Sequence, residues 1–404
     1  MSTSTAPISV LQSCNSWLPT TQKWLHTQVS ALPEDIRSPV AARCAENLDA
    51  FPVDELHVRD TDVLGVFPIG HLLKGMAKVG LFNALIQRRQ AQHWADFRRE
   101  IVRKRKVDLV HSHFGHHAIR DVPVVRSEEV AHVVSFYGYD AGFLPRKYPE
   151  IVEDYHDVFE SASAVLCEGP HFAETIESLG CSRDKIRVHH LGVDLENHPF
   201  RPRALNDPGD PVRILMAASF KQKKGLPDAI RALGGVHTSH DIEVTLIGEA
   251  DDSRRSKREH RRIRQAIEES DLGDSIRQKG FVPYDRLVDE MLDHHIFLSP
   301  SRTAETGDTE GGAPVSIIAA QATGMPVTST RHADIPHVLE HGETGLLADE
   351  RSVSQIRAHL ERLIDAPDSW AKLGKNARER IEAEFDARKQ GERLGEIYRD
   401  VVTP

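Results

Sequence analysis

Short apolar runs alternate along the chain with longer segments whose apolar residues recur at the spacing of a helix. In the first half, the apolar runs predict buried strands at 8–11, 38–42, 107–110, 130–136, 165–167 and 186–188. Between them, residues 22–32 carry Trp24, Leu25 and Val29 at helical spacing, and residues 71–89 predict another helix. This alternation is typical of an α/β domain with a mostly parallel sheet.

The same alternation begins again after a proline-rich linker. Its prolines are Pro199, Pro202, Pro208 and Pro211. Further strands are predicted at 213–217, 244–248, 276–281, 296–298 and 326–330, and the tail at 370–402 is predicted to be helical and charged. The 404 residues therefore predict two doubly wound, Rossmann-like domains, 1–200 and 201–379, that face each other across a cleft.

The most informative stretch is a glycine-rich turn, 310–314, that leads into a small apolar helix at 315–322. Gly324 ends this helix, and a buried strand follows. The small side chains of the turn leave backbone N–H groups free, and the helix start adds the positive end of its dipole. Glu310 at the mouth of such a turn suits the hydroxyls of a sugar. The residues alone predict a site for a phosphorylated, polyhydroxylated ligand.

Two polar segments, 111–115 and 137–140, directly follow predicted strands of the first domain. This places them at the carboxyl edge of the sheet, where ligands bind in such folds. Four histidines fall in or beside the first segment: His111, His113, His116 and His117. They suggest either a metal site or loop histidines that line a polar cleft. We favour the second interpretation, because no carboxylate completes the set at the usual ligand spacing.

Net charge and cysteine usage exclude several classes of protein. The formal net charge of -10 argues against nucleic acid as the main partner. The cysteines lie far apart and predict free, buried thiols in a reducing compartment: Cys14, Cys44, Cys167 and Cys181. No signal peptide or membrane-spanning stretch is evident, so a cytoplasmic protein is predicted.

A basic segment, 88–106, allows two interpretations. Trp94, Phe97 and Ile101 fall on one helical stripe among its arginines and lysines. Such a helix could lie on an anionic membrane surface as a peripheral contact. The alternative, which we favour, is a solvated helix that packs on its own domain through the aromatic residues.

Several short motifs follow one another through the second domain, at 220–225, 246–248, 280–282, 299–301, 310–314 and 322–327. The first domain adds His113-Phe114-Gly115 and the segment 136–140. In this order and spacing the chain resembles the family-4 retaining glycosyltransferases of the GT-B fold, over nearly its whole length. The resemblance is greatest to members that build polysaccharides.

The resemblance implies that the second domain binds a nucleotide-sugar donor and the first a glycan or lipid-linked acceptor. It also implies that a final helix, 380–404, crosses back onto the first domain. Lys224 matches a lysine that neutralises the donor diphosphate, and Glu310 matches a glutamate that holds hydroxyls of the donor sugar. Further donor-binding positions are Ser219, Gly225, Gly248, Phe281, Val282, Gly311, Gly312, Ala313, Pro314 and Ala319. Acceptor-side positions are His113, Tyr137 and Asp140.

The resemblance further implies attack from the face of the leaving group, with a phosphate oxygen taking the acceptor's proton. Neither a side-chain nucleophile, nor a metal, nor another cofactor is then expected.

Three positions depart from the family pattern. Ala319 stands where a glutamate grips the ribose, Ser219 stands where an arginine precedes the lysine, and Tyr137 replaces a common histidine. Loss of the ribose carboxylate is expected to cost on the order of 1–3 kcal/mol of donor binding. Two alternatives therefore stay open beside the transferase: a GT-B-shaped binding or scaffold protein that has lost turnover, and a hydrolase or epimerase on the same fold.

Overall fold

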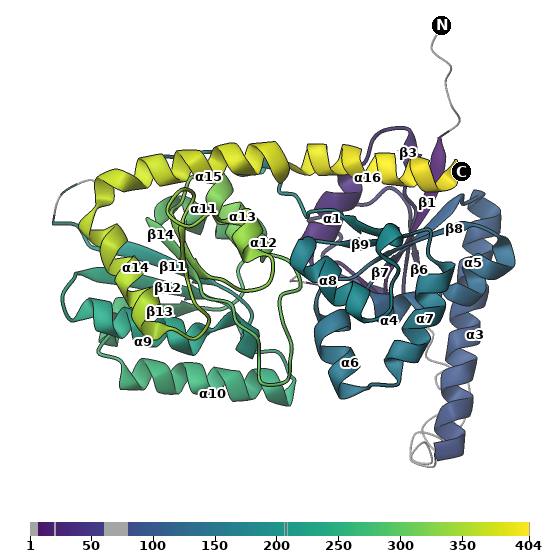
Figure 1. Ribbon diagram of the computed structural model, residues 1–404, viewed down its shortest axis with the longest axis horizontal. Helices are drawn as coiled ribbons and strands as arrows, with labels where there is room; N and C mark the ends of the chain where they lie inside the picture. Colours follow the sequence, from purple (N-terminus) through teal and green to yellow (C-terminus); the bar gives the residue numbers. More distant parts are fainter. Residues whose placement is uncertain (1–6, 20–21, 60–79, 206, 208, 404) are drawn as a thin grey trace, which may run out of the picture.

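The computed structural model describes residues 7–19, 22–59, 80–205, 207 and 209–403, which form two α/β domains side by side along the long axis (Figure 1). The first sheet is parallel, in the order β10-β9-β8-β7-β1-β4-β6. Its strands are β1 (Ile8–Ser13), β4 (Val40–Ala42), β6 (Leu56–Val58), β7 (Leu109–His113), β8 (Ala131–Ser135), β9 (Ala164–Cys167) and β10 (Ile186–Val188). A short β3 (Ile36–Arg37) also pairs with β1, and β2 (Ser16–Trp17) pairs separately with β5 (Cys44–Ala45).

The second sheet is also parallel, in the order β13-β12-β11-β14-β15-β16. Its strands are β11 (Val212–Ala217), β12 (Ile242–Ile247), β13 (Ile276–Lys279), β14 (Ile296–Ser299), β15 (Val327–Thr330) and β16 (Leu346–Ala348), the last of which the sequence pattern missed. In each sheet the chain first builds strands to one side of the initial strand and then to the other. The reversal falls between β1 and β7, and between β11 and β14. Ligands of doubly wound sheets bind outside the carboxyl ends of the strands at such a reversal.

Helices cover both faces of each sheet (Figure 1). Those of the first domain are α1 (Lys23–Ser30), α3 (Gly80–Arg105), α4 (Gly115–Ala118), α5 (Val122–Glu128), α6 (Leu144–Lys147), α7 (Ile151–Ser161) and α8 (Pro170–Ser178). Those that follow are α9 (Leu226–His237), α10 (Arg254–Glu269), α11 (Tyr284–Asp293), α12 (Val315–Ala322), α13 (Ile335–Val338), α14 (Val353–Asp365), α15 (Trp370–Glu384) and α16 (Ala387–Val402). Successive residues of β11 serve opposite faces: Ile214 packs with α9 and α14, and Leu215 with α12 and α15.

The tail is helical, as predicted, and consists of two helices. α15 belongs to the second domain, and the chain bends at Phe385 and Asp386, where the Asp386 side chain accepts a hydrogen bond from the Arg388 N–H at 3.0 Å. α16 then runs along the first domain (yellow in Figure 1). There Leu394 and Tyr398 are buried with apolar residues of β1, β7 and β8.

The aromatic stripe of the basic segment faces its own domain. The Trp94, Phe97 and Ile101 side chains on α3 are buried in a cluster with residues of β1, β7 and α5. Arg103 forms two hydrogen bonds of 2.8 Å with Glu128. The structure therefore favours the packing interpretation, because the apolar face that a membrane helix would need is occupied. The residues 71–79 of the predicted helix at 71–89 lie outside the described residues.

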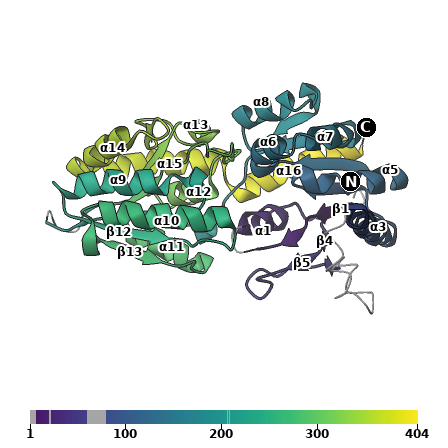
Figure 2. The same ribbon diagram turned by 90° about the horizontal axis from the view of Figure 1, so that it is seen from below.

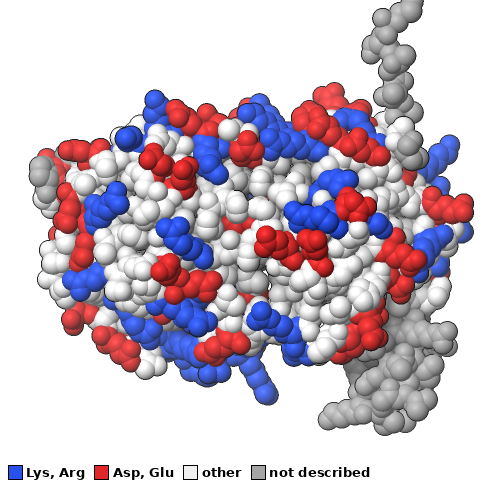
Figure 3. Space-filling view, viewed as in Figure 1, with Lys and Arg blue, Asp and Glu red and all other residues white. Residues whose placement is uncertain are grey.

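Charge and thiol placement add two observations. Acidic and basic side chains are interspersed over the face in Figure 3, and basic side chains gather along α10 at its lower edge. The cysteines are free, but Cys44 is exposed, contrary to the prediction that all four are buried. In the part of the chain that the structure describes, helices long and apolar enough to cross a membrane are absent.

Candidate functional site

Lys224 and Glu310 meet at the point where the second sheet reverses. Lys224 lies in the loop after β11, Glu310 lies in the loop after β14, and the Lys224 Nζ is 2.8 Å from the Glu310 carboxylate. Gly225 lets the two loops touch, because it has a φ of 65° and an added Cβ would lie 2.0 Å from the Pro300 carbonyl oxygen. Ser301 Oγ donates to the same carboxylate at 2.8 Å.

The charges around Glu310 hold it ionised. Burial by itself raises the pKa of this carboxyl, but Lys224 and then Lys223 outweigh burial and lower the pKa to about 2. Burial likewise lowers the pKa of Lys223, yet Glu310 and Asp308 raise it above its ordinary value. Glu310 and Lys223 are therefore both charged at neutral pH, with Lys224 and Asp308 as their neighbours.

His332 positions the backbone of the glycine-rich turn, a role that the sequence reasoning missed. The Glu310 N–H donates to His332 Nε2 at 3.2 Å, so this nitrogen is an acceptor and the ring proton sits on Nδ1. Nδ1 then donates to the Glu350 carboxylate at 2.6 Å. His332 comes almost directly after β15, and that placement is the signal by which it could have been found.

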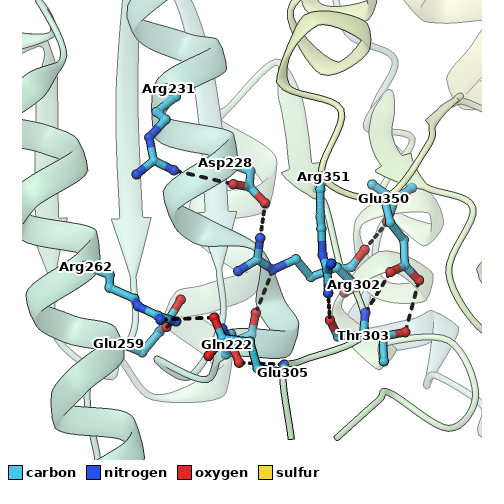
Figure 4. A network of polar contacts seen from close by, with 12 residues as sticks. Gln222, Asp228, Arg231, Glu259, Arg262, Arg302, Thr303, Glu305, Glu350 and Arg351 are labelled. Carbon is cyan, nitrogen blue, oxygen red and sulfur yellow. Dashed lines mark hydrogen bonds and ion pairs between the residues drawn. The ribbon is translucent and has the colours of Figure 1, made fainter. Parts of the chain in front are cut away.

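A polar network supports the loops that carry these groups (Figure 4). Arg302 donates to Asp228 on α9 at 2.6 Å and to the Gln222 carbonyl oxygen at 3.4 Å, which ties the loop after β14 to the loop of Lys224. The Thr303 N–H donates to Glu350 at 2.9 Å, so the carboxylate that orients His332 is itself held in place.

The glycine-rich turn also forms the contact between the domains. Gly311 has a φ of 80°, and an added Cβ would lie 2.7 Å from the Cα of Gly138, which follows β8 in the first domain. Asp334 of the second domain accepts hydrogen bonds from the N–H groups of His171 and Phe172 at the start of α8, at 2.8 and 3.1 Å. The carboxyl ends of both sheets thus face each other through these loops.

The other residues that were predicted to bind the donor lie in several different environments around Lys224 and Glu310. Ser219 and Gly248 lie just after β11 and β12, Ala313 and Pro314 are buried at the start of α12, and Gly312 lies against the Glu168 side chain. Phe281 is 41% exposed, its N–H donates to Glu249 at 3.2 Å, and Val282 follows it. Ala319 is buried among apolar side chains of α12, α13 and α15.

The residues that were predicted to contact the acceptor form hydrogen bonds within the protein, so they do not simply line an open cleft. His113 is fully buried at the end of β7, where Nδ1 bonds to Tyr137 Oη at 2.7 Å and Nε2 to Gln12 Oε1 at 2.9 Å. Asp140 accepts from the N–H groups of Gly115 and Tyr137 at 2.8 and 2.9 Å. Burial raises the pKa of Asp140 to about 6, against the effect of these hydrogen bonds. His113 and Asp140 therefore brace the loops around Tyr137, which remains half-buried.

The histidine interpretation needs a correction. His111 and His113 are strand residues of the core, not loop residues, and His111 bonds to Tyr398 at 2.6 Å and to Ser135 at 2.8 Å. With both ring nitrogens of each engaged, neither is placed to bind a metal. Across the described ranges, no group of three or more His, Cys, Asp or Glu side chains is arranged to hold a metal ion.

Known proteins share both halves of this chain. Residues 198–380 match the family described as glycosyl transferases group 1, and residues 49–197 match glycosyltransferase family 4. The amylovoran biosynthesis glycosyltransferase AmsK of Erwinia amylovora is 31% identical over 304 residues, which cover 72% of this chain and 69% of that protein. The putative colanic acid biosynthesis glycosyltransferase WcaL of Escherichia coli is 31% identical over 295 residues, with 70% and 68% covered.

Solved structures share the two-domain arrangement at low identity. The crystal structure of HepE from Anabaena with UDP and glucose has a TM-score of 0.77 and 15% identity, and covers 97% of this chain and 100% of that chain. Sucrose-phosphate synthase from Thermosynechococcus elongatus has a TM-score of 0.72 and 18% identity, with 97% and 98% covered.

Proposed function

The chain belongs to the group 1 glycosyltransferases of the GT-B fold, and from this premise we propose that it transfers a sugar from a nucleotide-sugar donor to a glycan or lipid-linked acceptor, with retention of anomeric configuration. The observation that carries the proposal is the meeting of Lys224 with Glu310 where the second sheet reverses. The chemistry of that pair suits a donor that has both phosphates and hydroxyls. The names of AmsK and WcaL support an acceptor in polysaccharide assembly.

In the proposed reaction the bond from the anomeric carbon to the diphosphate breaks and a bond to the acceptor oxygen forms on the same face. The acceptor's proton moves to the departing phosphate oxygen. Negative charge gathers on the diphosphate in the transition state, where the Lys224 ammonium and the amides at the start of α12 act most strongly. Glu310 holds donor hydroxyls, and Lys224 together with Lys223 keeps that carboxylate ionised.

The test uses UDP-, GDP-, ADP- and dTDP-sugars, each with and without methyl glycosides and polyprenyl-diphosphate sugars as acceptors. We expect release of one nucleoside diphosphate that depends on an acceptor, with a product whose anomeric configuration equals that of the donor by NMR. Donor binding by thermal shift without release in the presence of any acceptor would favour the scaffold alternative. Equal release without an acceptor would favour a hydrolase.

We also propose that the reaction needs no metal ion, since Lys224, Lys223 and the helix start are available for the charge of the leaving group. Activity after dialysis against EDTA should therefore equal activity with added Mg²⁺. A loss that Mg²⁺ or Mn²⁺ restores would contradict this proposal.

Ala319→Glu should tighten donor binding, because it returns a carboxylate to the position that faces the ribose in the family. The expected gain is on the order of 1–3 kcal/mol, or about 5- to 150-fold in Kd by titration calorimetry. Since Ala319 is only 1% exposed, the variant should also unfold at a lower temperature without donor. Ala319→Gln, with the same bulk and no charge, is the control, and an unchanged donor Kd in Ala319→Glu would show that position 319 does not face the ribose.

A further inference from the structure

Three aromatic rings meet at the carboxyl edge of the first sheet. The ring centroids of Trp24 and Tyr137 are 4.5 Å apart, those of Phe114 and Tyr137 4.7 Å, and those of Trp24 and Phe114 6.3 Å. All three side chains are only partly buried, whereas Trp17 and Phe136 of the same domain are completely buried. The three rings therefore keep part of their surface accessible, although Trp24 also packs against the apolar cluster that contains Trp17 and Leu25.

The elements that carry these rings flank the point where the first sheet reverses. Trp24 is on α1, which comes after β1 in the chain. Phe114 directly follows β7, and β1 lies between β7 and β4 in the sheet. This crevice is equivalent to the one that holds Lys224 and Glu310 in the second sheet. α1 also lies at the boundary between the domains (Figure 2), with the Lys23 Nζ 3.4 Å from the ring centroid of Tyr284 on α11.

The rings are held rigidly in place. Phe114 has a φ of 72°, which is strained for a bulky residue, and its N–H donates to the Ser135 carbonyl oxygen at 2.9 Å. Asp140 fixes the next residue, Gly115, and His113 fixes the Tyr137 hydroxyl. Strain of this kind persists where the surroundings force it, and it is concentrated at ligand sites.

The rings also border the proposed donor site. Tyr137 directly precedes Gly138, and an added Cβ on Gly311 would lie 2.9 Å from the Tyr137 carbonyl carbon. The backbone that carries the Tyr137 ring is thereby in contact with the turn that begins at Glu310.

The chemistry of the cluster suits an uncharged sugar ring. Aromatic faces carry partial negative charge and attract the weakly positive C–H groups on the apolar face of a pyranose. His116 and His117 border Phe114, with ring centroids 5.9 Å from it, and offer partners for hydroxyls. Burial, followed by Arg120, lowers the pKa of His116 to about 4, so this ring is neutral at pH 7.

We propose that Trp24, Phe114 and Tyr137 form a stacking platform for a pyranose ring of the acceptor. The platform orients that ring so that its attacking hydroxyl faces the donor at Glu310. This inference rests on the proposed function for the identity of its ligand, but it can be tested separately.

Fluorescence provides a direct binding test. Of the four tryptophans, Trp17, Trp94 and Trp370 are at most 2% exposed, which leaves Trp24 as the one that can report a bound ligand. Titration with methyl β-D-glucopyranoside, methyl β-D-galactopyranoside and methyl α-D-mannopyranoside should produce a saturable emission change with at least one of them. The change should be absent in Trp24→Phe. No change with any of the three, up to their solubility limits, would overturn the platform.

Kinetics provide the second test, and they use whichever acceptor supports release of the nucleoside diphosphate in the panel of nucleotide sugars described above. Trp24→Ala should raise the acceptor KM roughly tenfold or more while the donor KM stays unchanged, and Trp24→Phe should restore most of the loss. Tyr148→Ala is the matched control, because Tyr148 is an aromatic of the same domain that is 43% exposed and follows α6 rather than β1, β7 or β8.

The outcomes separate the two proposals. An active enzyme whose acceptor KM is unchanged in Trp24→Ala would overturn the platform and leave the proposed function intact. A raised donor KM would also overturn it, because the rings would then hold the donor. A wild-type chain that transfers no sugar would count against the proposed function, while the fluorescence titration still decides on the platform.

Discussion

Replacing Lys224 with methionine should reduce kcat by about 10²- to 10³-fold, with a smaller change in donor affinity. The Lys224 ammonium lies in the crevice of the second sheet, 2.8 Å from Glu310, where a departing diphosphate would gather charge. A positioned charge of this kind stabilises the transition state more than the bound substrate, and losses of this size are typical when one such group is removed. Steady-state rates of nucleoside diphosphate release, at saturating donor, measure the effect.

Lys221→Met is the control for this variant. Lys221 is in the same loop but pairs at the surface with Asp251, so its removal should change kcat little. A rise in donor KM with an unchanged kcat in Lys224→Met would show that Lys224 binds donor and transition state equally, and would contradict the proposed role.

Replacing Glu310 with glutamine should reduce kcat/KM by about 10²-fold. Glutamine retains an oxygen for the Ser301 hydroxyl, but it loses the charge that pairs with Lys224 and that would strengthen hydrogen bonds to donor hydroxyls. Because Glu310 is nearly buried and its removal leaves two lysines close together, the variant should also lose on the order of 3 kcal/mol of unfolding free energy. Activity should therefore be measured below the thermal transition of the variant, which calorimetry gives.

Glu305→Gln is the control for both expected losses of Glu310→Gln, in kcat/KM and in unfolding free energy. Glu305 lies in the same loop, but its side chain is 60% exposed and pairs with Arg262, so both activity and stability should stay close to wild type. If Glu310→Gln loses stability but keeps its kcat/KM, the carboxylate is a structural partner of the lysines and does not contact the donor.

The meeting of Lys224 with Glu310 could be expected from the sequence, because it depends on strand order alone. Both residues follow strands of a doubly wound sheet, and the first and fourth strands of such a sheet are neighbours. The glycines in these loops were informative for the same reason, since Gly225 and Gly311 mark places where backbones approach each other.

The contacts of His111, His113 and His332 could not be expected from local pattern. His111 looked like a loop residue because it is polar, but its partner Tyr398 is 287 residues away. His332 matters because its ring reaches the Glu310 N–H, and sequence spacing says nothing about that distance. The break in the tail, in contrast, had a local signal, since Asp386 is a favourable helix N-cap.

The placement of α16 has a consequence for the order in which the chain matures. Leu394 and Tyr398 complete the apolar cluster of β1, β7 and β8, yet they follow the whole second domain in the chain and leave the ribosome after it. The first domain therefore cannot complete this apolar cluster until the second domain and α16 have been synthesised. Until then, that part of its core stays exposed to water and to chaperones. A chain that ends at residue 385 should consequently show, on limited proteolysis, a resistant second half joined to a first half that is rapidly cut.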